Sequence, residues 1–141
     1  MKELKILLAD SYILLLKTHN FHWNVKGPMF HSLHTLFEEQ YNELFLAVDE
    51  IAERVRALGE RAPGSYAEFQ ELSEMKDSTE TSTKNMVREL IDSHRIVVET
   101  AKRLAVKAGE MGDDVTEDMA ISRKKIHDKA IWMLTTTLED E

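Results

Sequence analysis

The side chains best suited to chemistry lie in one stretch of the chain, from His19 to Glu53. This stretch holds four of the six histidines and six carboxylates, and the chain has no cysteine. Imidazole and carboxylate groups are ligands for iron and for similar metals, whereas thiolate ligands are not available here. The composition of the stretch therefore predicts a metal site built from histidine and carboxylate.

Two pairs of residues within this stretch have a spacing that favours metal binding. His22 and His34 lie on either side of Gly27-Pro28, where the chain must turn because proline disrupts a helix, so the two imidazoles could face each other. Asp49 and Glu53 are four residues apart. This spacing places both carboxylates on one face of a helix, where they suit a single cation.

The two pairs are too far apart to bind one metal ion within a single chain. Asp49 follows His34 by 15 residues, or ~22 Å along a continuous helix, whereas metal–ligand bonds are only about 2 Å long. Either the pairs are unrelated or a second subunit brings them together. If two copies of this helix pack antiparallel about a two-fold axis near residues 42 to 43, both shared sites form at once, because a two-fold interface is self-complementary.

Helical periodicity predicts the elements that position these residues. Apolar side chains recur three or four residues apart from Leu4 to His22 and again from Phe30 to Leu58, which indicates two helices joined by the turn at Gly27-Pro28. The second helix should contain about 29 residues, span ~43 Å and stop at Gly59.

The middle of the chain predicts one short helix and one long helix. Ser65 followed by Glu68 is a capping box, which should begin a short helix that ends near Ser73. The run from Asp77 to Glu80 offers N-cap residues for a long helix that continues to Gly109.

A turn and cap at residues 112–117 precede a last helix that extends to Leu138, and no stretch alternates with the period of a strand. Four long helices predict an all-α fold, a four-helix bundle with a short extra helix in the linker. The long linker fits a crossover that lets the second and third long helices run parallel, as in ferritin-like bundles. We expect one domain, residues 1–141.

Composition restricts the classes of function. A chain of 141 residues that is 43% hydrophobic is long enough to bury a core. Acidic residues outnumber Lys and Arg by 26 to 18, giving a net charge of -8, which argues against a surface that grips nucleic acid phosphates. The longest early apolar run, Tyr12 to Leu16, is far shorter than a signal-peptide core or a membrane span. We expect a cytoplasmic protein with no membrane contact.

The run from Lys17 to Arg54, KTHNFHWNVKGPMFHSLHTLFEEQYNELFLAVDEIAER, resembles the ferroxidase signature of the Dps family, the ferritin-like DNA-protection proteins of starved cells. The likeness extends through the linker sequence ALGERAPGSYAEF to the region of Trp132. The resemblance implies a hollow shell of twelve subunits. In that shell, ferrous iron would be oxidised, preferentially by hydrogen peroxide, and stored as ferric oxyhydroxide.

Carried over residue by residue, the resemblance assigns iron ligands. His22 and His34 would come from one subunit, and Asp49 and Glu53 from its two-fold mate. Glu38 stands where relatives commonly have aspartate and would help to hold a second iron.

The resemblance also assigns supporting roles. Trp23 is similar to the family tryptophan beside the iron centre and is expected to quench radicals. Asp113, Asp114 and Asp118 resemble the acidic lining of the three-fold iron-entry pore, although N-capping of the last helix explains at least one of them equally well. Ordinary packing or surface positions are expected for the other four histidines, and core positions for Trp132 and the methionines. These histidines are His19, His31, His94 and His127.

Alternatives remain at this stage. Many relatives owe DNA binding to a basic tail, whereas only Lys2 and Lys5 stand near the start here and the chain ends in residues 139–141, Glu-Asp-Glu, so direct DNA binding is not expected. A nucleoid-associated structural protein with a secondary metal site is the main rival. A bundle that binds haem or zinc through the same histidines is another. A ferritin proper would use Glu-x-x-His motifs inside one bundle, and no glutamate here has a histidine three residues on.

Overall fold

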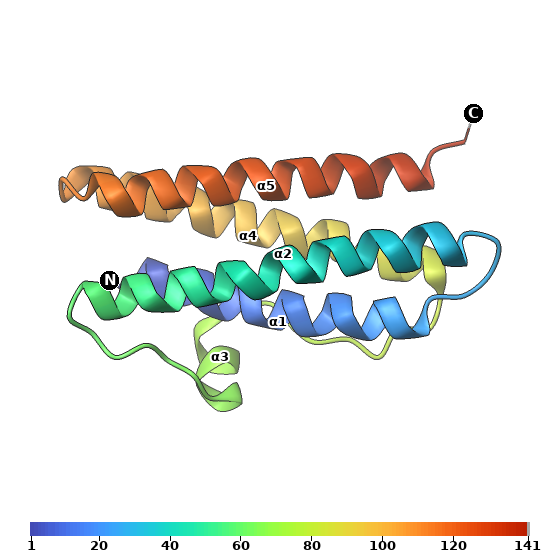
Figure 1. Cartoon of the computed structure of the whole chain (residues 1–141), viewed down its shortest axis with the longest axis horizontal. Coiled ribbons are helices and arrows are strands. Elements are labelled where there is room, and N and C mark those ends of the chain that lie inside the picture. Colours follow the sequence, from blue (N-terminus) through green and yellow to red (C-terminus); the bar gives the residue numbers. More distant parts are fainter. Residues whose placement is uncertain (141) are drawn as a thin grey trace.

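The structure is a computed structural model, and it describes residues 1–140. These residues form five helices and no strand: α1 (Lys2–Asn24), α2 (Phe30–Ala57), α3 (Tyr66–Leu72), α4 (Thr83–Glu110) and α5 (Asp114–Leu138). The four long helices lie side by side along one axis, and the short α3 lies beside α1 (Figure 1). The predicted all-α bundle with a short extra helix is confirmed.

The connections give the bundle its topology. A tight turn joins α1 to α2 at one end, and another joins α4 to α5 at the opposite end (Figure 1). Between them, the linker that carries α3 runs back along the length of the bundle, so α2 and α4 point in the same direction (Figure 1). The crossover expected from the length of the linker is therefore present.

The turns and caps around α2 and α3 follow the residues that predicted them. Gly27 has φ +94 and Gly59 has φ +89, a left-handed conformation that glycine adopts without steric cost. The Ser65 hydroxyl accepts a hydrogen bond from the backbone N–H of Glu68, and the Glu68 carboxylate accepts one from the backbone N–H of Ser65. The capping box and the end of α3 before Ser73 thus agree with the sequence.

The start of α4 differs from the sequence prediction. The helix begins at Thr83, with Ser82 as its N-cap, rather than in the acidic run that ends at Glu80. The Glu80 carboxylate accepts hydrogen bonds from backbone N–H groups ahead of the helix, including that of Ser82. The carboxylate of Asp77 accepts one from the Tyr66 hydroxyl at 2.8 Å. These hydrogen bonds hold both acidic side chains in the linker, and the Ser82 hydroxyl caps α4 by accepting a hydrogen bond from the backbone N–H of Asn85.

The core runs the length of the bundle, and most of the expected apolar positions on α1 and α2 are buried. The expectation for Trp132 and for two of the methionines is wrong in the single chain. Trp132 is 64% exposed on α5, and Met29 and Met111 are exposed in the turns that precede α2 and follow α4. Among the described residues, no helix has the length and apolarity needed to cross a membrane.

Candidate metal centre

His22 and His34 face each other across the turn between α1 and α2. Their rings stack with centroids 3.8 Å apart and planes 14° from parallel. Nδ1 of His22 lies 2.8 Å from the backbone oxygen of His34, and Nδ1 of His34 lies 2.7 Å from that of His22. A carbonyl oxygen can only accept, so Nδ1 carries the proton in both rings. In the neutral form of each ring, this tautomer leaves the lone pair on Nε2, as a metal-binding imidazole requires.

A carboxylate stands beside this histidine pair. Glu38 lies one turn after His34 on α2, and its Oε1 is 3.9 Å from Nε2 of His22. The Glu38 side chain is 51% exposed. Within residues 1–140, no three His, Asp or Glu side chains are arranged closely enough to hold a metal ion. One chain therefore supplies only part of a ligand set at this position.

Asp49 and Glu53 lie far from the histidine pair. Both are exposed on α2, and the helix is continuous from Phe30 to Ala57. The 15 residues from His34 to Asp49 therefore span ~22 Å. The structure brings His22, His34 and Glu38 together, and it does not bring the two acids to them within one chain.

Aromatic rings surround the histidine pair. Phe30 stacks on His34 with centroids 4.9 Å apart, and the rings of Tyr41 and His22 form a T-shaped pair with centroids 5.1 Å apart. Sequence reasoning missed Tyr41, although its place seven residues after His34 puts both on one face of α2.

His19 links two of these aromatic residues. Its ring is 4.0 Å from Trp23 and 4.5 Å from Tyr41, so the packing role expected for it is observed. Trp23 is 59% exposed.

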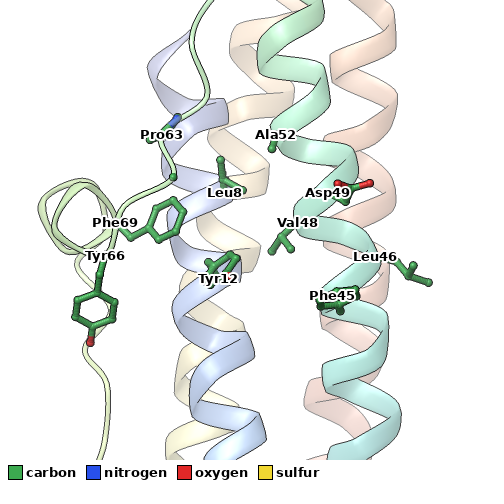
Figure 2. Close-up of a pocket in the computed structure, with 11 residues that line it drawn as sticks. Leu8, Tyr12, Phe45, Leu46, Val48, Asp49, Ala52, Pro63, Tyr66 and Phe69 are labelled. Carbon is green, nitrogen blue, oxygen red and sulfur yellow. The ribbon is translucent and has the colours of Figure 1, made fainter.

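An apolar groove lies between α1 and α2 and is flanked by the linker around α3 (Figure 2). Phe45 and Leu46 at its α2 side are 65% and 69% exposed, and Asp49 stands among the lining residues. Large apolar side chains that remain exposed together are typical of an interaction surface.

The acidic residues at the start of α5 divide into two kinds. Asp113 is the N-cap of α5, and its carboxylate accepts hydrogen bonds from Thr116 and from the Arg54 guanidinium at 2.8 Å. The hydrogen bonds from Thr116, followed by the effect of Arg54, hold the pKa of Asp113 below its ordinary value. Asp114 and Asp118 are exposed. The capping explanation therefore applies to Asp113.

A second histidine pair lies in the core, where His94 of α4 meets His127 of α5. Their Nδ1 atoms are 2.8 Å apart, and Nη2 of Arg123 donates to Nε2 of His127 at 2.8 Å. Arg123 also pairs with the carboxylate of Glu43 on α2, at 2.9 Å from Nη2. Because arginine can only donate, His127 accepts at Nε2 and donates from Nδ1 to His94. This network joins three helices.

Burial lowers the pKa of His94 to about 3 and lowers that of His127 well below its ordinary value. Both rings are therefore neutral at physiological pH. The packing role expected for both histidines is observed. No pattern in the sequence predicted that the two rings would contact each other.

The bundle and its crossover linker define a ferritin-like protein, and the family model of the ferritin-like domain matches residues 1–141. The crystal structure of Dps from Staphylococcus aureus is similar, with a TM-score of 0.95 and 41% identity over 99% of this chain and 95% of that chain. The DNA protection during starvation protein of Helicobacter pylori is 36% identical over 137 residues, which are 96% of this chain and 95% of the relative.

A third similar protein is Dps from Vibrio cholerae O1, which is described as a member of a broad superfamily of ferritin-like diiron-carboxylate proteins. Its TM-score is 0.93 and its identity 30%, over 97% of this chain and 87% of that chain. The chain belongs to the Dps family of ferritin-like proteins.

Proposed function

We propose that this protein is an iron-storage and detoxification protein of the cytoplasm. In this proposal it oxidises ferrous iron, preferably with hydrogen peroxide, at a ferroxidase centre between two subunits. The ferric product is stored in a hollow shell of twelve copies, each a single domain, and removal of iron and peroxide protects DNA. Membership of a diiron-carboxylate superfamily supports iron chemistry at the level of the family.

One observation carries the proposal. The His22 and His34 rings hold each other in the tautomer that leaves both Nε2 atoms free, yet their own chain supplies too few further ligands. Two matching carboxylates, Asp49 and Glu53, are exposed further along the same helix. A second copy packed antiparallel along α2 would bring these carboxylates to the histidines.

The apolar groove supports the same pairing. With a two-fold axis near residues 42 to 43 of α2, Phe45 and Leu46 lie within one turn of the axis and pack against the mate. Their 65% and 69% exposure in one chain would then be lost to the interface. Burial of apolar area is the main favourable term in association.

The proposed chemistry uses iron as substrate. The imidazoles of His22 and His34 and the carboxylates of Asp49 and Glu53 bind a ferrous ion, and Glu38 helps to hold a second one. One electron leaves each of the two ferrous ions, the O–O bond of one peroxide breaks, and two protons complete two water molecules. Hydrolysis of the ferric ions then yields mineral and protons.

Other residues have supporting roles in the proposal. Trp23 quenches radicals beside the centre. Asp114 and Asp118, which are exposed near the start of α5, contribute to an iron-entry pore. Asp113 lies beside them, but its carboxylate is engaged by Thr116 and Arg54.

Complementation between two variants tests the shared centre. One variant carries His22→Ala and His34→Ala, and the other carries Asp49→Ala and Glu53→Ala. Each alone should lose fast oxidation when it is loaded anaerobically with ferrous iron and then mixed with peroxide. Co-assembly should restore about a quarter of the wild-type rate, because half of the random pairs are mixed and half of the sites in a mixed pair have all four ligands.

The control is a mixture of the same two variants assembled separately and combined without exchange of subunits, which should stay inactive. A centre built within one chain predicts no recovery in any mixture. If verified mixed assemblies stay inactive, the shared centre is wrong. Parallel loading with air as the oxidant measures the preference for peroxide.

A further inference from the structure

A buried acidic side chain on α1 holds the end of α3. Asp10 is fully buried, and its two oxygens accept hydrogen bonds from the hydroxyl of Ser73, which follows α3, and from that of Thr100 on α4. The Ser73 hydroxyl in turn accepts a bond from the backbone N–H of Met75 at 3.0 Å. A buried carboxyl oxygen without a partner is costly, so these bonds are favoured. Asp10 therefore ties the linker to two long helices.

Contacts with α1 fix the position of α3. This helix has seven residues, too few for a helix that is stable alone. It packs against α1, where the Phe69 ring stacks on Tyr12 with centroids 5.0 Å apart. The stack holds the middle of α3, and the bond from Ser73 to Asp10 holds its C-terminal end.

α3 in turn forms part of the wall of the apolar groove. Tyr66 and Phe69 line the groove from α3, and Phe45 and Asp49 line it from α2 (Figure 2). In the proposed pairing of two copies, Asp49 binds iron together with the histidines of the mate. The position of α3 therefore affects how the mate packs beside Asp49.

We propose that Asp10 is a positioning residue for the pairing of two copies, because it holds Ser73 and so sets α3 as a wall against which the mate packs. The inference rests on the proposed pairing along α2 and adds to it a residue that acts at a distance. Asp10 is buried within its own chain, so it acts through Ser73 and not as a ligand. Loss of this bond would free the end of α3 and weaken the contact with the mate.

Ser73→Ala tests the link, because it removes the bond from the linker and leaves Asp10 in place. Hydrogen–deuterium exchange at the backbone amides of residues 66–75 should become about tenfold faster, as expected for the loss of one buried hydrogen bond. The protein concentration at which half of the chains are assembled, measured by sedimentation, should rise about tenfold. Iron oxidation per chain should fall at low protein concentration and return at high concentration, since the proposed ligands are intact.

Ser93→Ala is the matched control. It removes a buried hydroxyl that accepts a bond from Lys17 at 2.9 Å. That bond also joins α1 to α4, but it lies about two turns of α1 beyond Asp10. Assembly and exchange at residues 66–75 should stay as in the wild type. Asp10→Asn keeps the size of the side chain but sets an amide N–H against one of the two hydroxyls, so it should repeat the effect of Ser73→Ala.

The possible outcomes separate this inference from the proposed function. Unchanged assembly in Ser73→Ala and Asp10→Asn, or equal weakening by Ser73→Ala and Ser93→Ala, would overturn the role of Asp10 and leave the proposed function intact. A wild type that assembles but does not oxidise iron rapidly would overturn the proposed function, and the measurements of assembly would still decide the role of Asp10 in pairing.

Discussion

The buried pair of His94 and His127 should make the fold sensitive to mild acid. Both rings are neutral because burial in the core disfavours their charged forms, and the guanidinium of Arg123 adds to that effect. Glu43, the carboxylate of the network, is already paired with Arg123. Protonation of either histidine would therefore place a further positive charge beside Arg123 in the core. The perturbation is a change of pH from 7.5 to 5.0.

The magnitude follows from proton linkage. In the unfolded chain these histidines have a pKa of about 6.5, whereas burial lowers the pKa of folded His94 to about 3. Below pH 6.5 the unfolded state binds more protons, so the free energy of unfolding rises with pH. The contribution of the neutral histidines to the free energy of unfolding is fully present above their pKa in the unfolded chain. It is lost as the pH falls toward their pKa in the folded protein. At pH 5 the loss is about 2 kcal/mol for His94, and His127, whose pKa is also lowered, adds to it in the same direction.

Urea unfolding at a fixed protein concentration measures this loss, because the stability of an oligomer depends on concentration. The double variant His94→Gln and His127→Gln cannot titrate here, so its loss between pH 7.5 and 5.0 should be smaller than that of the wild type by at least about 2 kcal/mol. His127→Gln alone should recover part of the difference. The exposed His31→Gln is the control for simple loss of a histidine. Equal losses in the wild type and the double variant would refute the neutral buried pair.

Two further predictions concern charge and capping. Direct DNA binding at physiological salt and neutral pH should be negligible in a gel-shift assay, because the net charge of -8 opposes contact with phosphates; a tight, salt-sensitive complex would contradict this. Asp113→Ala should lower the free energy of unfolding by about 1 kcal/mol, because it removes both the N-cap of α5 and the partner of Arg54. The exposed Asp118→Ala should change it by less than about 0.5 kcal/mol, and equal effects of the two variants would argue against the cap.

The sequence predicted features that depend on local spacing. Apolar periodicity located the long helices, and the Gly27-Pro28 break placed His22 opposite His34, as the structure shows. The reciprocal bonds from each Nδ1 to the other backbone could not be predicted, because they depend on the geometry of the turn between α1 and α2. The N-cap of α4 was predicted too early, because the competing hydrogen bonds of Asp77 and Glu80 depend on the folded linker.

The buried hydrogen-bond network of His94, His127, Arg123 and Glu43 could not be predicted from the sequence, for a different physical reason. His94 and His127 are 33 residues apart, and their contact depends on the register of α4 against α5. The charged residues did not indicate this contact either, because Arg123 and Glu43 look like ordinary surface residues in the sequence. In the structure, Arg123 is buried. A pattern of apolar positions finds the helix faces, but it does not say which polar side chains meet between them.

The positions of the proposed ligands along α2 favour one orientation of the proposed two-fold mate. His34 lies in one half of α2, and Asp49 and Glu53 lie in the other, with the exposed Phe45 and Leu46 near the middle. In a parallel pair in register, Asp49 would lie beside Asp49 of the mate and stay ~22 Å along the helix from either His34. An antiparallel pair would set Asp49 and Glu53 of each copy against the histidines of the mate and would keep the apolar side chains near the middle of the contact. The ligand set that one chain lacks and the apolar surface that it leaves exposed therefore support the same assembly.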